Sequence, residues 1–282
     1  MSVADGHGLV GIGYRPELTP ALELAAPAER PELLELVADH FFADPERAEA
    51  LADRTPVVIH DLGLSVGTRG GSASAAGRDQ LARLRDLVQR TRPVVVSTHL
   101  AVTRSSCGVA LGHLAPLWNT RRTLACVEGE VKAVQDSLGR AIALENIAAP
   151  FVVPGADLSE PELLFELCER TGCGLLLDVS NLLQNARNFG FDAARWLREH
   201  PVHAVLQVHL AGGAEEHGFF VDSHATGVEK ASFALLEELA RHLPGSPPII
   251  VERDRGLPPL AELLREAAHA RSVWQKAQRD AA

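Results

Sequence analysis

The chain has 282 residues, and 27 Lys and Arg stand against 37 Asp and Glu, which gives a formal net charge of −10. This balance argues against a nonspecific nucleic-acid binder, because such binding needs a basic surface that releases counterions. Hydrophobic residues make up 46% of the chain and aromatic residues 5%. The chain can therefore bury a full core, but it offers little for a carbohydrate or peptide groove built on aromatic rings.

Nothing in the sequence indicates export or a membrane anchor. The segment Met1 to His7 lacks the basic and apolar regions of a signal peptide, and no apolar run reaches the roughly 18 residues of a membrane span. The four cysteines have neither CxxC spacing nor the density of a disulfide scaffold; they are Cys107, Cys126, Cys168 and Cys173. We expect a cytoplasmic protein without a structural disulfide.

Short apolar, β-branched runs alternate with helical patterns from end to end. The expected strands are 10–14, 34–38, 56–60, 94–100, 142–147, 175–181, 205–211 and 249–254. Helical periodicity covers 79–89, 123–138, 229–242 and 259–272, and Ser159 to Glu162 reads as a capping box at the start of a further helix.

This alternation predicts one α/β domain over residues 1–282. Parallel strands need crossover helices, and eight β/α units about 30 residues apart favour a (β/α)8 barrel over an open doubly wound sheet, which usually has fewer strands. The length alone would also allow two domains. The glycine-rich segment Gly67 to Gly77 is either a flexible loop over the barrel mouth or a tolerated surface insertion.

Metal-binding residue types end six successive strands. A barrel builds its active site at the carboxyl ends of its strands, and those ends carry His60, His99, Glu145 with Asn146, Asp178, His209 and Glu252, while the loop after the seventh strand adds Asp222 and His224. A single histidine there would most often be structural. The whole set, buried together, would cost several kcal/mol per group unless cations were bound.

The type of ligand narrows the choice of metal. Imidazoles and carboxylates without cysteine ligands favour iron, manganese or zinc. Four histidines and four carboxylates suffice for two ions, with Glu145 or Asp178 as a bridge. The other histidines are expected to be structural or solvated, with His40 and His217 nearest the mouth; they are His7, His40, His113, His200, His203, His217, His242 and His269.

Other motifs are weak. Gly11 and Gly13 lack the third glycine and the acidic partner of a dinucleotide fingerprint, so we expect a close backbone approach beneath the site. The sequence has no P-loop and no G-x-S-x-G elbow. Cys168 and Cys173 are expected to be buried, and nothing marks either as a nucleophile.

Eight motifs in order resemble the multinuclear non-heme iron-dependent oxidases, the family of the methanobactin-biosynthesis oxidase. The motifs are Gly11–Glu17, His60–Gly67, Ser97–Leu100, Leu144–Ile147, Leu175–Asn181, Val208–Gly212, Asp222–His224 and Glu252–Asp254. The resemblance implies a xylose-isomerase-like barrel that holds two or three irons of mixed valence. It implies an enzyme that uses dioxygen to modify cysteine residues of a ribosomally made precursor peptide, which a small partner protein presents.

The resemblance also implies roles for single residues. Glu145, Asp178, His209 and Glu252 would hold one iron, and the first three would be catalytic. His60 and His99 would hold a second iron and share Glu145. Asp222 and His224 would serve a third, and Asn146 and Asn181 would bind substrate.

Four positions depart from the family pattern. Thr98 and Gln207 stand in place of glutamates, Ser180 in place of an asparagine, and Phe189 in place of a histidine. Because a phenyl ring cannot ligate a metal, the loss at Phe189 predicts two firmly bound irons and a weak or absent third.

Two other functions compete. A divalent-metal isomerase or endonuclease acting on a sugar or phosphate would gather the same residue types on the same barrel, although the acidic charge disfavours the nuclease. A non-catalytic metal-binding or peptide-presenting protein is the second alternative.

Overall fold

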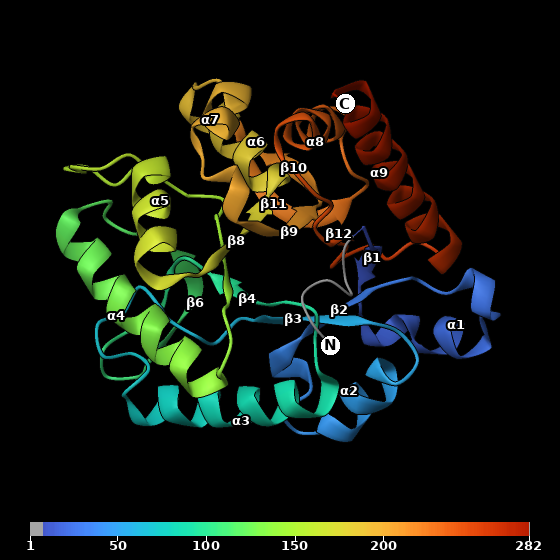
Figure 1. The fold of residues 1–282 in the computed structure, drawn as a ribbon, viewed down its shortest axis with the longest axis horizontal. Coiled ribbons are helices and arrows are strands. Elements are labelled where there is room, and N and C mark those ends of the chain that lie inside the picture. The colour runs from blue at the N-terminus through green and yellow to red at the C-terminus, as the bar shows by residue number, and fades with distance from the viewer. Residues whose placement is uncertain (1–7, 282) are drawn as a thin grey trace.

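Eight parallel strands close into a barrel in the computed structural model, which describes residues 8–281 (Figure 1). Around the barrel the order is β1-β12-β9-β8-β7-β4-β3-β2. The strands are β1 (Val10–Gly13), β2 (Leu34–Val37), β3 (Val57–Asp61), β4 (Val96–His99), β7 (Ala143–Glu145), β8 (Gly174–Asp178), β9 (Val205–Leu210) and β12 (Ile249–Val251). The predicted (β/α)8 barrel is confirmed.

Helices surround the strands on the outside (Figure 1). They are α1 (Thr19–Leu24), α2 (Pro45–Ala52), α3 (Ala75–Thr91), α4 (Arg121–Leu138), α5 (Glu160–Thr171), α6 (Val179–Phe189), α7 (Ala193–Glu199), α8 (Lys230–His242) and α9 (Leu260–Ala281). The capping box is present at α5, where the hydroxyl of Ser159 accepts from the Glu162 amide and the Glu162 carboxylate accepts from the Ser159 amide at 2.7 Å.

Several expected boundaries are wrong, and one has a clear cause. The strand expected over 175–181 ends at Asp178, because the carboxylate of Asp178 accepts from the Asn181 amide at 2.8 Å and so caps α6. The strands expected over 142–147 and 249–254 also end early, at Glu145 and Val251. Helix α9 instead runs nine residues beyond its predicted end, since Trp274 and Ala277 continue its buried stripe.

Two antiparallel hairpins follow β4 and β9, and neither is predicted by the sequence pattern. The first is β5 (Val102–Arg104) with β6 (Ala110–Ala115), and the second is β10 (Gly212–Glu216) with β11 (Phe219–Thr226). In the first hairpin β6 is mostly exposed, the second hairpin is mostly half-buried, and both contain register shifts, so neither shows a strict alternation of buried and exposed residues. Their position after barrel strands places them on the side of the mouth.

The glycine-rich segment is fastened against α4. Backbone amides of Gly70 and Ser72 donate to the carboxylate of Glu130 on α4, at 2.6 and 2.9 Å. Gly77 is buried in the first turn of α3, where an added Cβ would lie 2.0 Å from the Gly71 oxygen. These contacts support a packed connection more than a flexible lid.

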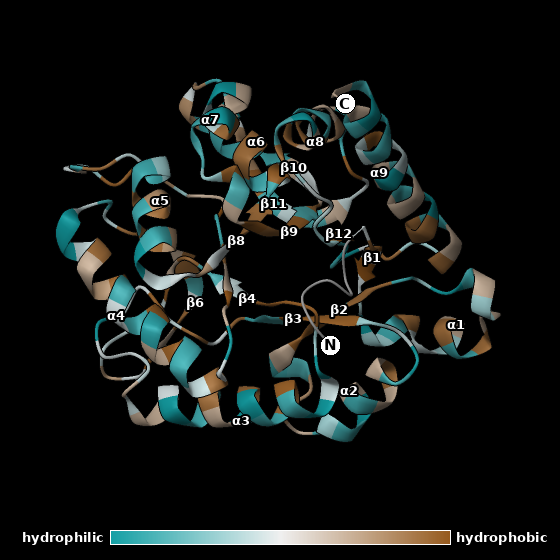
Figure 2. Ribbon diagram, viewed as in Figure 1, coloured by the Kyte–Doolittle hydropathy of each residue, from teal (hydrophilic) through white to brown (hydrophobic). Residues whose placement is uncertain are grey.

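The barrel interior is layered with a period of two residues. An apolar layer at the bottom consists of Leu33, Val58, Val95, Ala143, Leu176 and Ile250. Two residues further along each strand, where the side chain again points inward, stand Glu35, His60, Ser97, Glu145, Asp178 and Glu252. A second, larger core lies between the strands and the helices, whose surfaces carry both hydrophobic and hydrophilic residues (Figure 2).

Gly11 lies in β1, beside the bottom layer. A Cβ there would lie 2.0 Å from the backbone oxygen of Leu33, so the expected close backbone approach is present. All four cysteines are unpaired in the structure, and Cys168 and Cys173 are buried. Among the described helices, none is both long and apolar enough to cross a membrane.

Candidate metal centre

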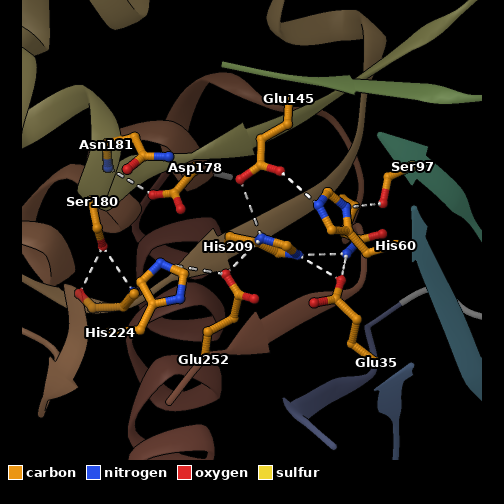
Figure 3. Close-up of polar contacts among 12 residues, drawn as sticks. Glu35, His60, Ser97, Glu145, Asp178, Ser180, Asn181, His209, His224 and Glu252 are labelled. Atoms are coloured by element: carbon orange, nitrogen blue, oxygen red, sulfur yellow. Dashed lines mark hydrogen bonds and ion pairs between the residues drawn. The ribbon is translucent and has the colours of Figure 1, made fainter. Parts of the chain in front are cut away.

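The predicted residues converge at the mouth of the barrel (Figure 3). His60 is the penultimate residue of β3, and His99, Glu145 and Asp178 end β4, β7 and β8. His209 comes from β9, Glu252 follows β12, and His224 and Asp222 reach the site from β11. Most of these side chains are almost inaccessible, with Asp178 at 0% and His209 at 1% exposure.

A first group joins two histidines to Glu145. The Nε2 atoms of His60 and His99 each lie 3.4 Å from Oε2 of Glu145. The Nδ1 of His60 contacts the Ser97 hydroxyl at 2.9 Å, and that hydroxyl donates to the Ile59 oxygen. Nδ1 therefore carries the proton, and the lone pair of Nε2 faces Glu145. Burial and the neighbouring His99 lower the pKa of His60 to about 3, so its ring is neutral.

A second group centres on Nδ1 of His209. This atom lies 2.9 Å from Oε2 of Glu252 and 3.5 Å from Oε1 of Glu145, and Asp178 completes the group with Glu145 and His209. The opposite nitrogen, Nε2, contacts Oε2 of Glu35 at 2.7 Å.

Glu35 is the site residue that the sequence analysis missed, and with His209 and Glu252 it forms a further donor group. It is fully buried in β2 and accepts a further hydrogen bond from the Gln207 amide at 2.7 Å. Its signal was a charged residue at the centre of an apolar strand. That signal is weak, since Glu35 does not stand at a strand end.

A third group contains Asp178, His224 and Glu252. The Nε2 of His224 lies 2.6 Å from Oδ1 of Asp222 and 3.9 Å from Oε2 of Glu252. The Nδ1 of His224 contacts Asp254 at 3.1 Å, and Asp254 is in turn paired with Arg15. His224 has a φ of 47°, a left-handed conformation that is uncommon for residues other than glycine.

The donor set fits bound metal ions. Among the described residues, the buried side-chain atoms without a hydrogen-bond partner include Oε2 of Glu145, Oδ2 of Asp178, Nδ1 of His209 and Nε2 of His224. They nevertheless lie close to other site atoms, as ligands of one ion do. Two ligands about 2.1 Å from an ion lie roughly 3.0 to 3.4 Å apart at tetrahedral or octahedral angles. Imidazole and carboxylate donors suit iron, manganese or zinc.

The charges of the site are strongly perturbed. Burial alone would raise the pKa of Glu252, but His209 and His224 lower it well below its usual value. Burial likewise works against the charged form of these histidines, yet Glu252 and other carboxylates raise the pKa of both well above the usual value. Burial, with Asp222 and Glu145, raises the pKa of Asp178. The site thus retains protons that a cation would displace.

The two asparagines hold Asp178 in place. The side chain of Asn146 donates to the Asp178 oxygen and accepts from the Asp178 amide, both at 2.9 Å. Asn181 donates from its side chain to the Asn146 oxygen at 3.2 Å, and its Oδ1 is buried without a hydrogen-bond partner. Their expected contact with substrate stays a prediction, and of the two only Asn181 has an amide oxygen left for it.

The four departures from the family pattern have structural contacts. Thr98 donates to the Asp61 oxygen at 2.9 Å, and the Ser180 hydroxyl both donates to and accepts from the Ala211 backbone at 2.9 Å. Gln207 supports Glu35, as described above. The ring of Phe189 lies 6.1 Å from that of Phe219, at the wall of a cavity.

The remaining histidines stay outside the four donor groups, as far as the described residues show. His200 is buried and contacts the Trp196 oxygen, His242 pairs with Glu238, and His269 packs on Phe233. The side chains of four others are exposed; they are His40, His113, His203 and His217. His7 lies outside the described residues.

The fold and the site together define an α/β barrel whose mouth is built of carboxylates and imidazoles. A family model described as "RiPP precursor modification enzyme MbnB/TglH/ChrH" matches residues 9–275. A UPF0276 protein of Chromobacterium violaceum is 38% identical over 97% of both chains, and one of Rhizorhabdus wittichii is 37% identical over 98% of both. This chain therefore belongs to the family of enzymes that modify ribosomally synthesised precursor peptides.

Solved structures confirm the xylose-isomerase-like barrel. The chain is similar to a D-psicose 3-epimerase, with a TM-score of 0.54 and 12% identity over 95% of this chain and 94% of the other. It is also similar to endonuclease IV from Thermus thermophilus, with a TM-score of 0.55 and 18% identity over 96% and 99%. At these identities the similarity concerns the fold alone.

Proposed function

We propose that this protein is a multinuclear non-heme iron-dependent oxidase that uses dioxygen to modify cysteine residues of a ribosomally synthesised precursor peptide. The observation that carries the proposal is the set of overlapping donor groups at the mouth, in a chain that belongs to a precursor-modification family. Glu145 and Asp178 are each shared between two groups. Shared carboxylates are what neighbouring ions in a multinuclear site need.

The geometry supports a specific distribution of ligands. His60, His99 and Glu145 would hold one ion, and Glu145, Asp178 and His209 a second. Glu252 contacts both His209 and His224, so it would lie between the second ion and a third at His224. The resemblance implies that Glu145, Asp178, His209 and Glu252 all bind one ion. In the distribution proposed here, these residues are instead shared between neighbouring ions.

Iron, when bound, would supply an acceptor for a cysteine thiolate and a route for electrons from that cysteine to dioxygen. A four-electron oxidation of the residue balances the reduction of one dioxygen to two waters, and the four protons required leave the substrate with the electrons. The residues of the chain hold the metal ligands in position. Glu145 keeps two groups adjacent, Ser97 fixes the ring of His60, and Glu35 fixes the ring of His209.

Further expectations belong to the same proposal. A small partner protein would present the peptide, the reaction would take place in the cytoplasm, and neither nucleic acid nor a membrane would take part. A divalent-metal isomerase or endonuclease remains the competing function, but its support is the shared fold alone.

The test combines metal analysis with turnover. The protein is purified anaerobically and supplied with dioxygen and a cysteine-containing precursor peptide encoded beside its gene. We expect iron charge-transfer bands, oxygen consumption and a mass change confined to cysteine. Glu145→Gln should abolish all turnover, whereas Glu32→Gln, at an exposed position outside the site, should not. A colourless zinc or manganese protein, or an iron protein that leaves the peptide unchanged, would refute the proposal.

A further inference from the structure

A mostly apolar cavity lies beside the metal centre. Its volume is about 270 Å³, and four of the chain's few aromatic side chains line it: Phe151, Phe189, Phe191 and Trp196. The low aromatic content had argued against a ring-lined groove. The tertiary structure nevertheless concentrates these four rings in one place.

The cavity abuts the strand ends that carry the metal ligands. Leu100 in its wall directly follows His99, and Ile147 stands two residues after Glu145. Two residues of extended chain span about 7 Å. A peptide side chain in the cavity would therefore lie only a few peptide residues away from a peptide residue held at the first donor group.

A second, more open hollow connects the cavity to the other end of the site. It has a volume of about 710 Å³ and lies between β6, the segment 148–151 and β11. Pro116, Ala149 and Phe151 line both hollows, and the second one extends to Asp222. The two form one mostly apolar cleft that runs from Asp222, which contacts His224, to the first cavity.

Exposed apolar residues stand on the same chain segments that line the cleft. Within residues 8–281, five large hydrophobic side chains are exposed on the segments after β4 and β7; they are Val109, Leu111, Trp118, Phe151 and Val152. Phe151 is 56% exposed although it lines both hollows. Apolar groups gathered around a cleft mark a binding surface, whereas single exposed ones do not.

The walls of the cavity are held in place. The side chain of Asn185 accepts from the Ala149 amide and donates to the Ile147 oxygen, both at 2.8 Å, and so fixes the segment after β7. Glu160 adds one carboxyl group to the wall, and burial raises its pKa to about 7. The pocket is therefore preformed and mostly apolar, with a few polar groups, as ligand pockets usually are.

We propose that this first cavity binds a large apolar side chain, best an aromatic one, of the precursor peptide, two or three residues away from the cysteine at the metal centre. A cavity of roughly 150 Å³ already holds a benzene ring, so 270 Å³ is ample for phenylalanine. The cleft gives the peptide a continuous path from the cavity to the donor groups. This inference rests on the proposed function for the identity of the ligand.

The experiment measures binding without turnover. Synthetic decapeptides with one central cysteine carry a single phenylalanine at one to four positions from it, on an alanine and serine background. They are added anaerobically to the full-length, iron-loaded protein, and the fluorescence of Trp196 in the cavity wall is followed. Trp196→Phe identifies which part of the signal comes from this residue.

We expect peptides with phenylalanine two or three residues from cysteine to bind at least about tenfold more tightly than the alanine peptide. Ala149→Phe, which fills the cleft, should abolish that preference. Phe165→Ala should keep it, because Phe165 is exposed on α5 and lines neither hollow. Bound iron and melting temperature should be unchanged in both variants, which excludes misfolding.

Equal affinity at every phenylalanine position, or a preference that survives Ala149→Phe, would overturn the proposal. A partner protein that loses its affinity for Ala149→Phe while the peptide preference persists would assign the cavity to the partner instead. The test is separable from that of the proposed function. If the phenylalanine position affects binding but no cysteine is oxidised, the oxidase proposal is refuted and the cavity proposal stands. If cysteine is oxidised but the phenylalanine position has no effect on binding, the cavity proposal is refuted and the oxidase proposal stands.

Discussion

Glu35 and His209 face each other across the barrel interior, with Oε2 of Glu35 2.7 Å from Nε2 of His209. They come from β2 and β9, which have β1 and β12 between them. The contact turns Nδ1 of His209 toward Glu145 and Glu252. A carboxylate on the far nitrogen of a metal-binding histidine fixes the ring and raises its basicity.

This relationship predicts a metal defect in Glu35→Gln. The substitution keeps the size of the side chain but removes its charge, so affinity for the ion at His209 should fall by about 10- to 100-fold. Iron retained against a graded series of chelator concentrations measures this. Glu32→Gln, on an exposed residue just before β2, is the control. Unchanged retention with an unchanged melting temperature would show that Glu35 has no role in metal binding.

His60 and His99 should be needed for one ion and not for the fold. Replacing either with alanine removes a ligand from the first group, while the barrel core lies in the layer beneath. Bound iron should fall by about one equivalent, with the circular dichroism spectrum unchanged. His113→Ala, on an exposed hairpin, should lose no iron. Insoluble His60 or His99 variants would instead mean that the two rings are structural.

The third ion should be labile. Asp178 and Glu252 also take part in other groups, which leaves His224 and Asp222 as the side chains devoted to it. Phe189 cannot add a ligand. We expect about two irons per chain after purification of iron-replete protein, because losing a ligand weakens a site beyond the roughly 10- to 100-fold effect of outer contacts. Three irons per chain that survive chelation would contradict this prediction. His217, on the same hairpin, is exposed and belongs to none of the donor groups, so it does not replace the missing ligand in this structure.

Metal binding should release protons. In the metal-free protein, burial lowers the pKa values of His209 and His224, but nearby carboxylates, Glu252 above all, together raise them by more. The net result is a raised pKa for both rings, so both are protonated at neutral pH. A metal must displace those protons, and affinity should therefore rise with pH. Zinc added to metal-free protein should release about one proton per histidine, followed with an indicator dye. A His209→Ala, His224→Ala double variant should release correspondingly fewer, and equal release would contradict the assignment.

Gly11→Ala should destabilise the barrel. The added methyl group would overlap the Leu33 oxygen, and overpacking of this kind costs about 1 to 3 kcal/mol. Gly129→Ala is a matched change in α4, where nothing lies near the new atom, and it should stabilise the protein by about 0.5 to 1 kcal/mol. Urea denaturation of both variants measures the difference. Equal stability would mean that β1 can shift away from β2 without cost.

The sequence by itself determined the barrel and most of its donor residues. Strand alternation has a period of two, so an apolar residue followed two positions later by His60, Glu145 or Asp178 already implies a core with a polar mouth. Crossover helices between parallel strands then bring all strand ends to one side. These are local and topological rules, and they need no coordinates.

Tertiary structure alone decided how the donors are grouped and what supports them. His209 and Glu35 lie on strands that are three positions apart around the barrel. The distance between the two side chains therefore depends on how the barrel closes. The hairpin that carries His224 lacks a regular pattern, and the end of β8 depended on Asp178 acting as a helix cap. The cavity around Trp196 collects residues from several separate connections. Sequence periodicity records which face a side chain occupies, whereas distances between strands are set by closure of the sheet.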